Sequence, residues 1–325
     1  MASAFEEALG NIEPTKSDKS QAAQAHLDIR DVMNQDEKLR EWGINPVLIG
    51  SYRRQVAIRR IKDVDVFCRL DAVPEDVTGR QALNHFSKVI KAHYGEDAVT
   101  PQARSLNVEV ATWGGLHVDI VPARPGDRYW EIPDKGDPAS GWQETNPEEL
   151  TACSTAMNKQ LADMYVPLVK LVRQTRRAIG IKRPGGLYVE TALYKACQEG
   201  RVDGTTLREL YISALRGLAD VTREKVDQSI EIPDPTRPLE KLFFRATDFQ
   251  WASARERLEE AATRAEETRD QERCKAEVVF RELLGQNSDG DWVYPLPSDC
   301  NEDGTSKSRV YVGDRSGSKE PQRYA

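Results

Sequence analysis

One alternating stretch, residues 61–68, constrains the fold more than any other. It reads Ile-Lys-Asp-Val-Asp-Val-Phe-Cys, and this alternation of β-branched or aromatic residues with polar ones predicts a β-strand. Side chains two positions apart share one face of a strand, so Asp63 and Asp65 project together while Val64 and Val66 face a core. Two carboxylates held this close repel each other, and a bound divalent cation is the usual remedy.

A second strand pair is predicted further along the chain. Residues 105–110 alternate in the same way, the glycines of Trp113-Gly114-Gly115 permit a turn, and residues 116–121 form the returning strand. Asp119 lies on this returning strand, with apolar neighbours on its other face. If this strand pairs beside the first, three carboxylates converge at one point of a sheet.

Three converging carboxylates are the ligands expected for two Mg²⁺ ions, or Mn²⁺ in their place. Mg²⁺ prefers oxygen ligands and is usually held by carboxylates together with substrate phosphates, and two ions can assist an in-line displacement at phosphorus. Asp63, Asp65 and Asp119 are therefore the candidate catalytic and metal-binding residues. Gly50-Ser51 follows the apolar residues 47–49, and a small-residue turn after a strand can offer backbone N–H groups and a hydroxyl to phosphate.

Several of these motifs together resemble a known superfamily. The segments Gly50–Arg54, Asp63–Phe67 and His117–Pro122 are similar to the polymerase-β-type nucleotidyltransferases. The similarity is greatest to the bacterial cGAS/DncV-like enzymes (CD-NTases), which are relatives of oligoadenylate synthetase. Further matching stretches extend the resemblance over about residues 20 to 285, namely 141–147, 166–173, 182–186 and Glu190.

The resemblance implies both a fold and an activity. The expected fold is α/β (α+β), a polymerase-β-like core with a small mixed sheet and a helical C-terminal lobe. The expected enzyme joins nucleoside triphosphates such as ATP or GTP into a cyclic di- or trinucleotide second messenger, releases pyrophosphate, and serves bacterial anti-phage (CBASS) signalling. Two alternatives remain: template-independent nucleotide addition to RNA ends or a protein side chain, and a catalytically silent nucleotide sensor.

Basic residues supply the candidate nucleotide contacts. One cluster surrounds the Gly50-Ser51 turn and includes Arg54, and a second lies on a predicted helix with Lys170 and Arg173. A cationic pocket suits a small polyanion such as a triphosphate. The related enzymes often carry a Lys followed by an aromatic residue near Arg173-Gln174, so the choice between Lys170 and Arg173 as phosphate partner stays open.

The elements divide the chain into three predicted parts. Residues 1–144 form the catalytic core with an N-terminal spine helix, residues 145–286 form a helical lobe that closes the nucleotide cleft, and residues 287–325 form a largely flexible tail. The predicted helices cover residues 20–42, 79–94, 161–179, 187–198, 207–223 and 246–284. The Pro-rich stretches 123–140 and 232–238 are predicted as loops.

Composition excludes several function classes. No apolar run reaches membrane-span length and no leader precedes the first helix, so we expect a cytoplasmic protein. The net charge of −7 argues against a long nucleic acid as partner. The five cysteines show no paired spacing, so we expect reduced thiols rather than a disulfide framework or a zinc site. In some similar enzymes a flexible C-terminal end is attached covalently to targets by a ubiquitin-transfer-like partner. The resemblance therefore implies that CBASS accessory proteins act through the C-terminal tail, with Ala325 as the candidate end that is attached to targets.

Overall fold

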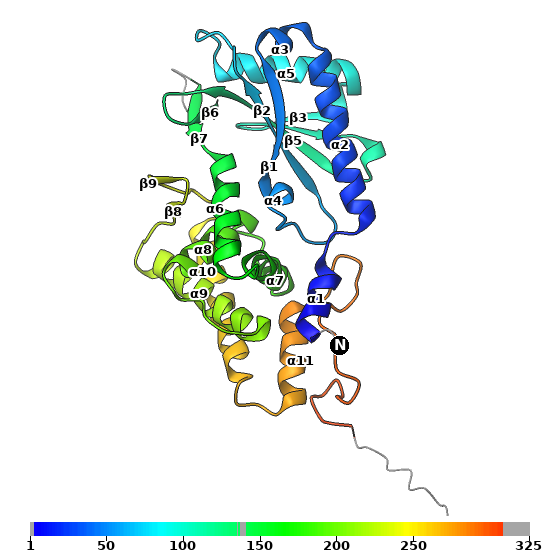
Figure 1. Cartoon of the computed structure of the whole chain (residues 1–325), viewed down its shortest axis with the longest axis vertical. Helices are drawn as coiled ribbons and strands as arrows, with labels where there is room; N and C mark the ends of the chain where they lie inside the picture. Colours follow the sequence, from blue (N-terminus) through cyan, green and yellow to red (C-terminus); the bar gives the residue numbers. More distant parts are fainter. Residues whose placement is uncertain (1–2, 135, 137–140, 308–325) are drawn as a thin grey trace, which may run out of the picture.

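The computed structural model describes residues 3–134, 136 and 141–307. Two lobes stand one above the other along the long axis (Figure 1). The upper lobe holds the mixed sheet and the lower lobe is helical, as expected for a polymerase-β-like core with a helical C-terminal lobe. The tail at Ala325 and residues 308–325 lie outside the described residues.

The central sheet has the strand order β1-β2-β5-β4-β3. The first three of these strands are β1 (Ile44–Ile49), β2 (Asp63–Leu70) and β5 (His117–Pro125). β1 pairs antiparallel with β2, whereas β2 pairs parallel with β5. The predicted hairpin is confirmed, because β4 (Leu106–Glu109) pairs antiparallel with β5. β3 (Val99–Pro101) completes this edge of the sheet.

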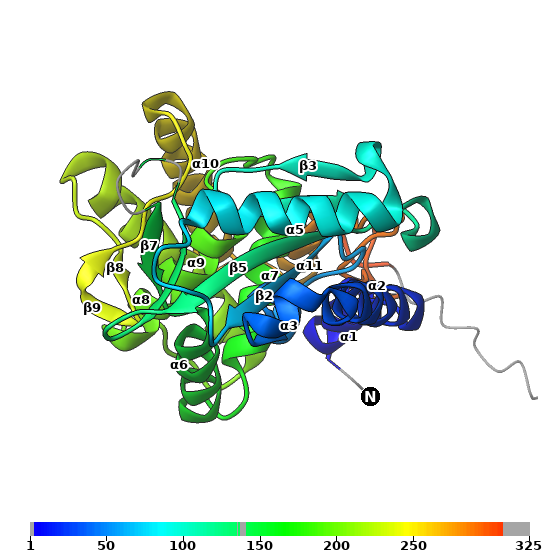
Figure 2. The same ribbon diagram turned by 90° about the horizontal axis from the view of Figure 1, so that it is seen from above.

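The two faces of the sheet have different roles. Val64 and Val66 of β2, with Val118 and Ile120 of β5, are buried in one apolar cluster with α2 (Lys16–Gln35) and α5 (Gly79–Tyr94). Figure 2 shows these two helices covering that side of the sheet. The intervening side chains, which include the three aspartates, therefore project from the other face. The alternation in the sequence predicted this division correctly.

Helix boundaries follow local capping signals. α5 begins with a capping box made by Thr78 and ends at Gly95, as predicted. The helix predicted for residues 20–42 is two helices, α2 and α3 (Glu37–Glu41), because Asp36 is extended and caps the second one. The helix predicted for 246–284 is likewise divided into α10 (Asp248–Glu267) and α11 (Arg273–Leu284).

The lower lobe contains α6 (Pro147–Gln160), α7 (Tyr165–Ala178), α8 (Gly186–Gln198), α9 (Leu207–Asp227), α10 and α11. α1 (Ala4–Ile12) also belongs to it, because Phe5, Ala8 and Ile12 are buried in the apolar cluster of this lobe. The predicted boundary that assigned residues 1–144 to the catalytic core is therefore wrong for the first helix. Its apolar face is too short to indicate which lobe covers it.

Both predicted Pro-rich loops contain strands, which corrects the sequence-based expectation. Within residues 123–140, β5 continues to Pro125 and β6 (Trp130–Pro133) pairs with it and with β7 (Trp142–Thr145). Within residues 232–238, β8 (Pro233–Asp234) pairs with β9 (Arg237–Lys241). Proline is tolerated here because edge strands leave backbone N–H groups unpaired.

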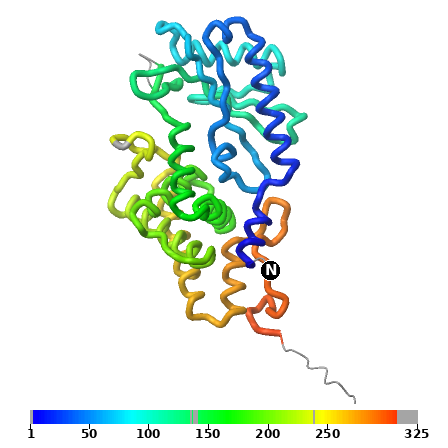
Figure 3. Tube along the Cα trace, in the orientation of Figure 1, coloured from blue at the N-terminus to red at the C-terminus, as the bar shows by residue number. Residues whose placement is uncertain are grey.

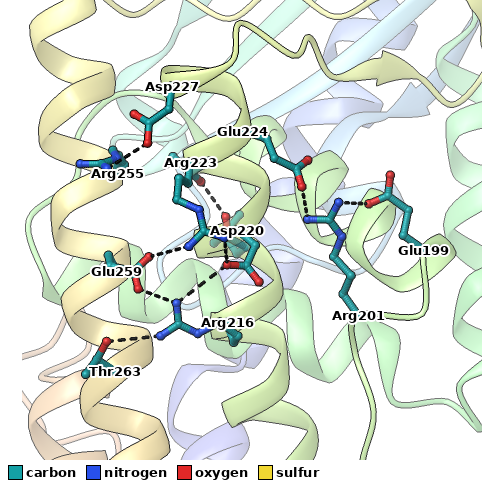
Figure 4. A network of polar contacts seen from close by, with 12 residues as sticks. Glu199, Arg201, Arg216, Asp220, Arg223, Glu224, Asp227, Arg255, Glu259 and Thr263 are labelled. Carbon is teal, nitrogen blue, oxygen red and sulfur yellow. Dashed lines mark hydrogen bonds and ion pairs between the residues drawn. The ribbon is translucent and has the colours of Figure 1, made fainter.

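Charged residues connect α9 and α10 through a network of ion pairs (Figure 4). Arg216 of α9 lies 2.6 Å from Glu259 of α10, and Arg255 of α10 lies 2.9 Å from Asp227 of α9. The charged residues of α10 thus pair with the neighbouring helices α9 and α11. Its apolar stripe, with Trp251, Leu258 and neighbouring alanines, packs on the core.

The segment after α11 is packed, so the prediction of a tail that is largely flexible from residue 287 is wrong for 287–307. Val293 and Tyr294 are buried in the core of the helical lobe. Cys274 and Cys300 form a disulfide, which also corrects the expectation of reduced thiols. The two cysteines are 26 residues apart with Cα atoms 5.3 Å from each other, a proximity that spacing alone does not reveal.

We predict that this disulfide is present in purified protein and stabilises it. The denatured chain should expose three thiols without reductant, those of Cys68, Cys153 and Cys197. A loop of this length constrains the unfolded chain, so Cys300→Ser should lower the free energy of unfolding by about 3 kcal/mol. Denaturant titration measures this, with Cys153→Ser as the matched control. Five titratable thiols without reductant would contradict the assignment.

Candidate active site

Strand register brings the three predicted acids together. In the β2–β5 pair, Asp65 lies directly opposite Asp119, and Asp63 lies opposite His117. Asn107 of β4 donates a hydrogen bond from Nδ2 to Asp119 Oδ1 (2.9 Å), which orients that carboxylate. The convergence predicted from the sequence is therefore confirmed.

Gly50 is required by the close approach of Asp65. It begins the short helix α4 (Gly50–Arg53) with φ of +72°, a left-handed conformation that favours glycine. A Cβ atom at this position would lie 1.7 Å from Asp65 Oδ2. Any side chain at residue 50 would displace the carboxylate, so the Gly-Ser turn and the acids form a single unit.

Holding the three carboxylates close together in a partly buried site costs electrostatic free energy. Burial first, and then repulsion from Asp63 and Asp119, raise the pKa of Asp65 to about 7, although the charges of Arg54 and Arg173 oppose the shift. Burial also raises the pKa of Asp119, against the effect of its hydrogen bond from Asn107. The negative charges are thus held together without enough cations to neutralise them.

These residues fit a divalent cation by their chemistry. They present carboxylate oxygens, the ligands that Mg²⁺ prefers, and their mutual repulsion would be relieved by such an ion. Among residues 3–134, 136 and 141–307, however, no three His, Cys, Asp or Glu side chains are arranged so that they could hold a metal ion by themselves. Substrate phosphates and water would complete the coordination, as is usual for Mg²⁺.

A cleft of about 380 Å³ opens in front of Asp63 and Asp65, between the two lobes, whereas Asp119 is not among its lining residues. The sheet lobe contributes Gly50, Ser51, Asp63 and Asp65 to its wall. The facing wall comes from the helical lobe and from the β8–β9 hairpin, and it includes Asn146, Leu150, Arg173, Gly186, Leu187, Glu190, Asp234 and Thr236. The cleft falls in the size range of small-molecule sites.

Arg173 is the cation best placed to meet an anion in this cleft. Its guanidinium lies against Gly186, where a Cβ would come within 2.7 Å of Nη2. Its Nη1 is buried and has no hydrogen-bond partner in the part of the chain that the structure describes. Burial lowers the pKa of Arg173, while the charges of Glu190 and Asp63 oppose that shift. A buried donor without an acceptor is costly, and a bound anion would satisfy it.

Arg54 also lines the cleft, but its guanidinium is already engaged. Nε donates to Glu190 Oε1 at 2.6 Å and Nη2 donates to Glu190 Oε2 at 3.0 Å. Both side chains are buried, so this bidentate pair ties the sheet lobe to α8. Arg54 therefore acts on the cleft by holding its walls together.

Lys170 does not enter this cleft. Its Nζ forms an ion pair with Glu13, and it lines a separate pocket of about 480 Å³ with Lys19, Tyr52 and Arg53. Of the two candidate phosphate partners, Arg173 lines the cleft together with Asp63 and Asp65, and Lys170 does not. In the basic cluster near Gly50, Arg59 and Arg60 share one carboxylate, that of Asp289.

Sequence reasoning did not anticipate the wall formed by the β8–β9 hairpin. Asp234 and Thr236 are buried there, and Asp234 Oδ1 accepts bonds from Thr236 N (2.9 Å) and Oγ1 (2.7 Å). Arg237 Nε donates to Asp234 Oδ2 at 3.0 Å, which completes a rigid turn. The Asp-Pro-Thr sequence is a turn signal, but it does not indicate that the turn lies against the cleft.

Comparison with known proteins agrees with this geometry. Residues 1–158 match the family model described as the Second Messenger Oligonucleotide or Dinucleotide Synthetase domain (SMODS). A cyclic AMP-AMP-AMP synthase from Acinetobacter is 26% identical over 298 residues, which cover 86% of this chain and 83% of that protein.

Two solved structures share the fold. Escherichia coli CdnC with ATP has a TM-score of 0.65 at 16% identity, covering 87% of this chain and 96% of that one. Vibrio cholerae DncV, a cyclic AMP-GMP synthase, has a TM-score of 0.61 at 13% identity, covering 88% of this chain and 87% of that one.

The acids, the Gly-Ser turn and the two-lobed fold define an enzyme of the nucleotidyltransferase class. Residues 1–158 match the SMODS family model, and the chain is similar in sequence and in fold to the cGAS/DncV-like nucleotidyltransferases (CD-NTases). No helix among the described residues is long and apolar enough to cross a lipid bilayer.

The raised pKa of Asp65 predicts a pH-dependent stability in metal-free protein. The unfolded chain releases this proton near 3.8 whereas the folded protein keeps it up to about pH 7, so the folded state loses stability as the pH rises between these values. We expect the melting temperature in EDTA to fall by roughly 5 °C more from pH 5 to pH 8 in the wild type than in Asp65→Asn. Scanning fluorimetry measures this, and equal slopes for both proteins would contradict it.

Proposed function

We propose that this chain joins nucleoside triphosphates into a cyclic di- or trinucleotide second messenger and releases pyrophosphate. The observation that carries the proposal is the cleft between the lobes, which has converging carboxylates on one wall and the unpartnered Arg173 on the other. A metal–triphosphate complex has the complementary charges, since its cation would meet the acids and its phosphates would meet the guanidinium. The curated Acinetobacter relative, named for a product with three adenylates, makes ATP the first substrate to test.

Each residue then has a defined role. Asp63, Asp65 and Asp119 would hold two Mg²⁺ ions, or Mn²⁺, and these would supply Lewis-acid activation of the attacking hydroxyl and of the leaving pyrophosphate. Gly50 and Ser51 line the same wall, and the Ser51 hydroxyl and the backbone N–H groups of this turn would contact the donor phosphates. Arg173 would bind phosphate oxygens from the opposite side, through charge-assisted hydrogen bonds.

The reaction itself is the first test. Incubation with labelled ATP, GTP, CTP and UTP and Mg²⁺ should yield a phosphatase-resistant product whose mass is that of a cyclic di- or trinucleotide. Asp63→Asn/Asp65→Asn should reduce the rate by at least 10³-fold, because removal of the ligand charges removes the stabilisation of the transferred phosphoryl group. Asp71→Asn, an exposed carboxylate just beyond the end of β2, is the matched control. A product of linear nucleotides only would overturn the cyclic assignment.

The two candidate cations can be separated by mutation. Arg173→Met should raise KM for the triphosphate or lower kcat/KM by about 10- to 100-fold, since a hydrogen bond to a charged group contributes about 1.5–3 kcal/mol. Lys170→Met should leave kcat/KM within about threefold, because Lys170 pairs with Glu13 outside the cleft. Steady-state pyrophosphate release measures both variants. The reverse ranking would reassign the phosphate contact to Lys170.

The alternative of adding nucleotides to RNA ends or to a protein side chain requires room for a long acceptor. The net charge of −7 and the engagement of Arg54, Arg59 and Arg60 in ion pairs weigh against RNA. Label that migrates with tRNA in the assay above would support this alternative. Triphosphate binding without pyrophosphate release would support a catalytically silent sensor.

We place the enzyme in the cytoplasm, where nucleoside triphosphates are supplied, and in anti-phage (CBASS) signalling. Cys274 and Cys300 are 2% and 1% exposed, so burial slows reduction of their disulfide by cytoplasmic thiols.

Accessory proteins acting through the C-terminal tail remain part of this proposal, with Ala325 as the candidate attachment point. Intact-mass analysis after co-expression with neighbouring gene products tests that attachment.

A further inference from the structure

A loop of eight or so residues carries the chain from the Gly50-Ser51 turn to Asp63. This active-site loop, residues 55–62, contains two non-glycine residues in the left-handed region, Gln55 with φ of +61° and Arg60 with φ of +59°. Such conformations are unfavourable for side chains with a Cβ atom and persist only where the surroundings enforce them. The position of Asp63 at the end of this loop therefore depends on what holds the loop.

One group that holds it is Asp289, which comes from the opposite end of the sequence. The backbone N–H groups of Arg59 and Arg60 also donate, to Ile12 O (2.6 Å) and to Asp18 Oδ2 (3.3 Å). One carboxylate oxygen of Asp289, Oδ2, forms an ion pair with Arg59 Nε at 2.8 Å in which Nε is not aligned for a hydrogen bond, and the other, Oδ1, accepts a hydrogen bond from Arg60 Nε at 2.7 Å. Ser288 adds a contact from Oγ to the carbonyl oxygen of Arg59 at 3.3 Å. One side chain thus fixes two consecutive residues of the active-site loop.

Asp289 is itself fixed by a dense set of contacts in residues 286–294, which we name the C-terminal strap. The side-chain oxygen of Asn287 accepts bonds from the backbone N–H groups of Asp289 (2.9 Å) and Asp291 (3.1 Å). Asn287 Nδ2 donates to the carbonyl of Asn11 at 3.1 Å, and Asn11 Nδ2 donates to the carbonyl of Val293 at 3.0 Å. The strap is therefore a preformed turn attached to the end of α1.

The strap also contacts α7, the helix that carries Arg173. Gln174 Nε2 donates to the carbonyls of Leu284 (2.7 Å) and Gln286 (2.9 Å), and Arg177 Nη1 donates to Ser288 Oγ (2.6 Å). Figure 3 shows the orange segment after α11 running beside the blue N-terminal stretch. The strap consequently connects the loop before Asp63 with the helix that supplies the facing cation.

We propose that the C-terminal strap is a positioning device for the catalytic acids, with Asp289 as its positioning residue. The carboxylate of Asp289 holds the active-site loop in its left-handed conformation, and this conformation sets the distance between Asp63 and Arg173 across the cleft. Asp289 itself touches no substrate. The proposal about loop order stands on the contacts alone, whereas its effect on catalysis rests on the proposed function.

Asp289→Asn tests the proposal, because it keeps the shape of the side chain and removes its charge. Asp291→Asn is the matched control, since Asp291 makes the same change in net charge, is exposed, and contributes to the strap through its backbone. Full-length wild type and both variants are compared by hydrogen–deuterium exchange of the peptides that cover residues 55–62. Exchange in this loop should accelerate at least about tenfold in Asp289→Asn and remain at the wild-type rate in Asp291→Asn.

The kinetic readout separates positioning from general damage. With Mg²⁺ and ATP, Asp289→Asn should lower kcat about tenfold or more, while KM for ATP changes less than about threefold. The variant should also need a higher Mg²⁺ concentration for its half-maximal rate. A purely structural role would instead lower the melting temperature and leave the Mg²⁺ requirement unchanged. Equal loop exchange in both variants would overturn the proposal.

A second variant and the exchange experiment decide the role of the strap even if Asp289→Asn does not fold or no turnover is observed. If Asp289→Asn does not fold, Arg60→Gln removes one partner of the same contact at a side chain that is 63% exposed, and the same loop acceleration is expected from it. If no variant and no wild type turns over triphosphate, the proposed function fails, but the exchange experiment still decides the role of the strap. Unchanged exchange in Arg60→Gln would count against it.

Discussion

The parallel pairing of β2 with β5 is the constraint from which the chemistry of this protein follows. It sets Asp65 directly against Asp119, while the alternation of the strands buries Val64, Val66, Val118 and Ile120 on the other side. A register slip of one residue would move the acids into the apolar core, so hydrophobic burial enforces the position of the charges. The energy of the core thus offsets the repulsion of carboxylates that no local interaction would otherwise hold together.

A second layer of ionic contacts places the lobes around these acids. The buried Arg54–Glu190 pair joins the end of α4 to α8, Lys170 joins α7 to Glu13, and Asp289 binds Arg59 and Arg60. Buried pairs contribute little net stability because desolvation opposes their attraction, but they are specific in geometry. Most basic residues near the Gly-Ser turn therefore form ion pairs that orient the walls of the cleft. Arg173 lines the cleft with a buried Nη1 that has no hydrogen-bond partner among the described residues.

The extent to which the sequence predicted this arrangement depends on how local each signal is. The aspartates, Gly50, Ser51 and the α5 boundaries follow from period-two alternation and from caps within a few residues. The assignment of α1 to the helical lobe and the Cys274–Cys300 pairing depend on distant partners. The sequence did not reveal the ion pairs of Lys170 and Arg54 for the same reason. Their partners, Glu13 and Glu190, lie far from them in the sequence.

Departures from ordinary structural preference gather where the proposed reaction would occur. Asp65 has a raised pKa, Arg173 has a buried donor without an acceptor, and Gln55 and Arg60 adopt left-handed conformations in the loop between Ser51 and Asp63. Unmatched polar atoms occur elsewhere in the described chain, but Arg173 is the one among them that lines this cleft. Such penalties cluster at functional sites because the ligand relieves them. A polyphosphate with divalent cations relieves the acids and Arg173 in a single binding event, whereas a neutral ligand would leave both unsatisfied.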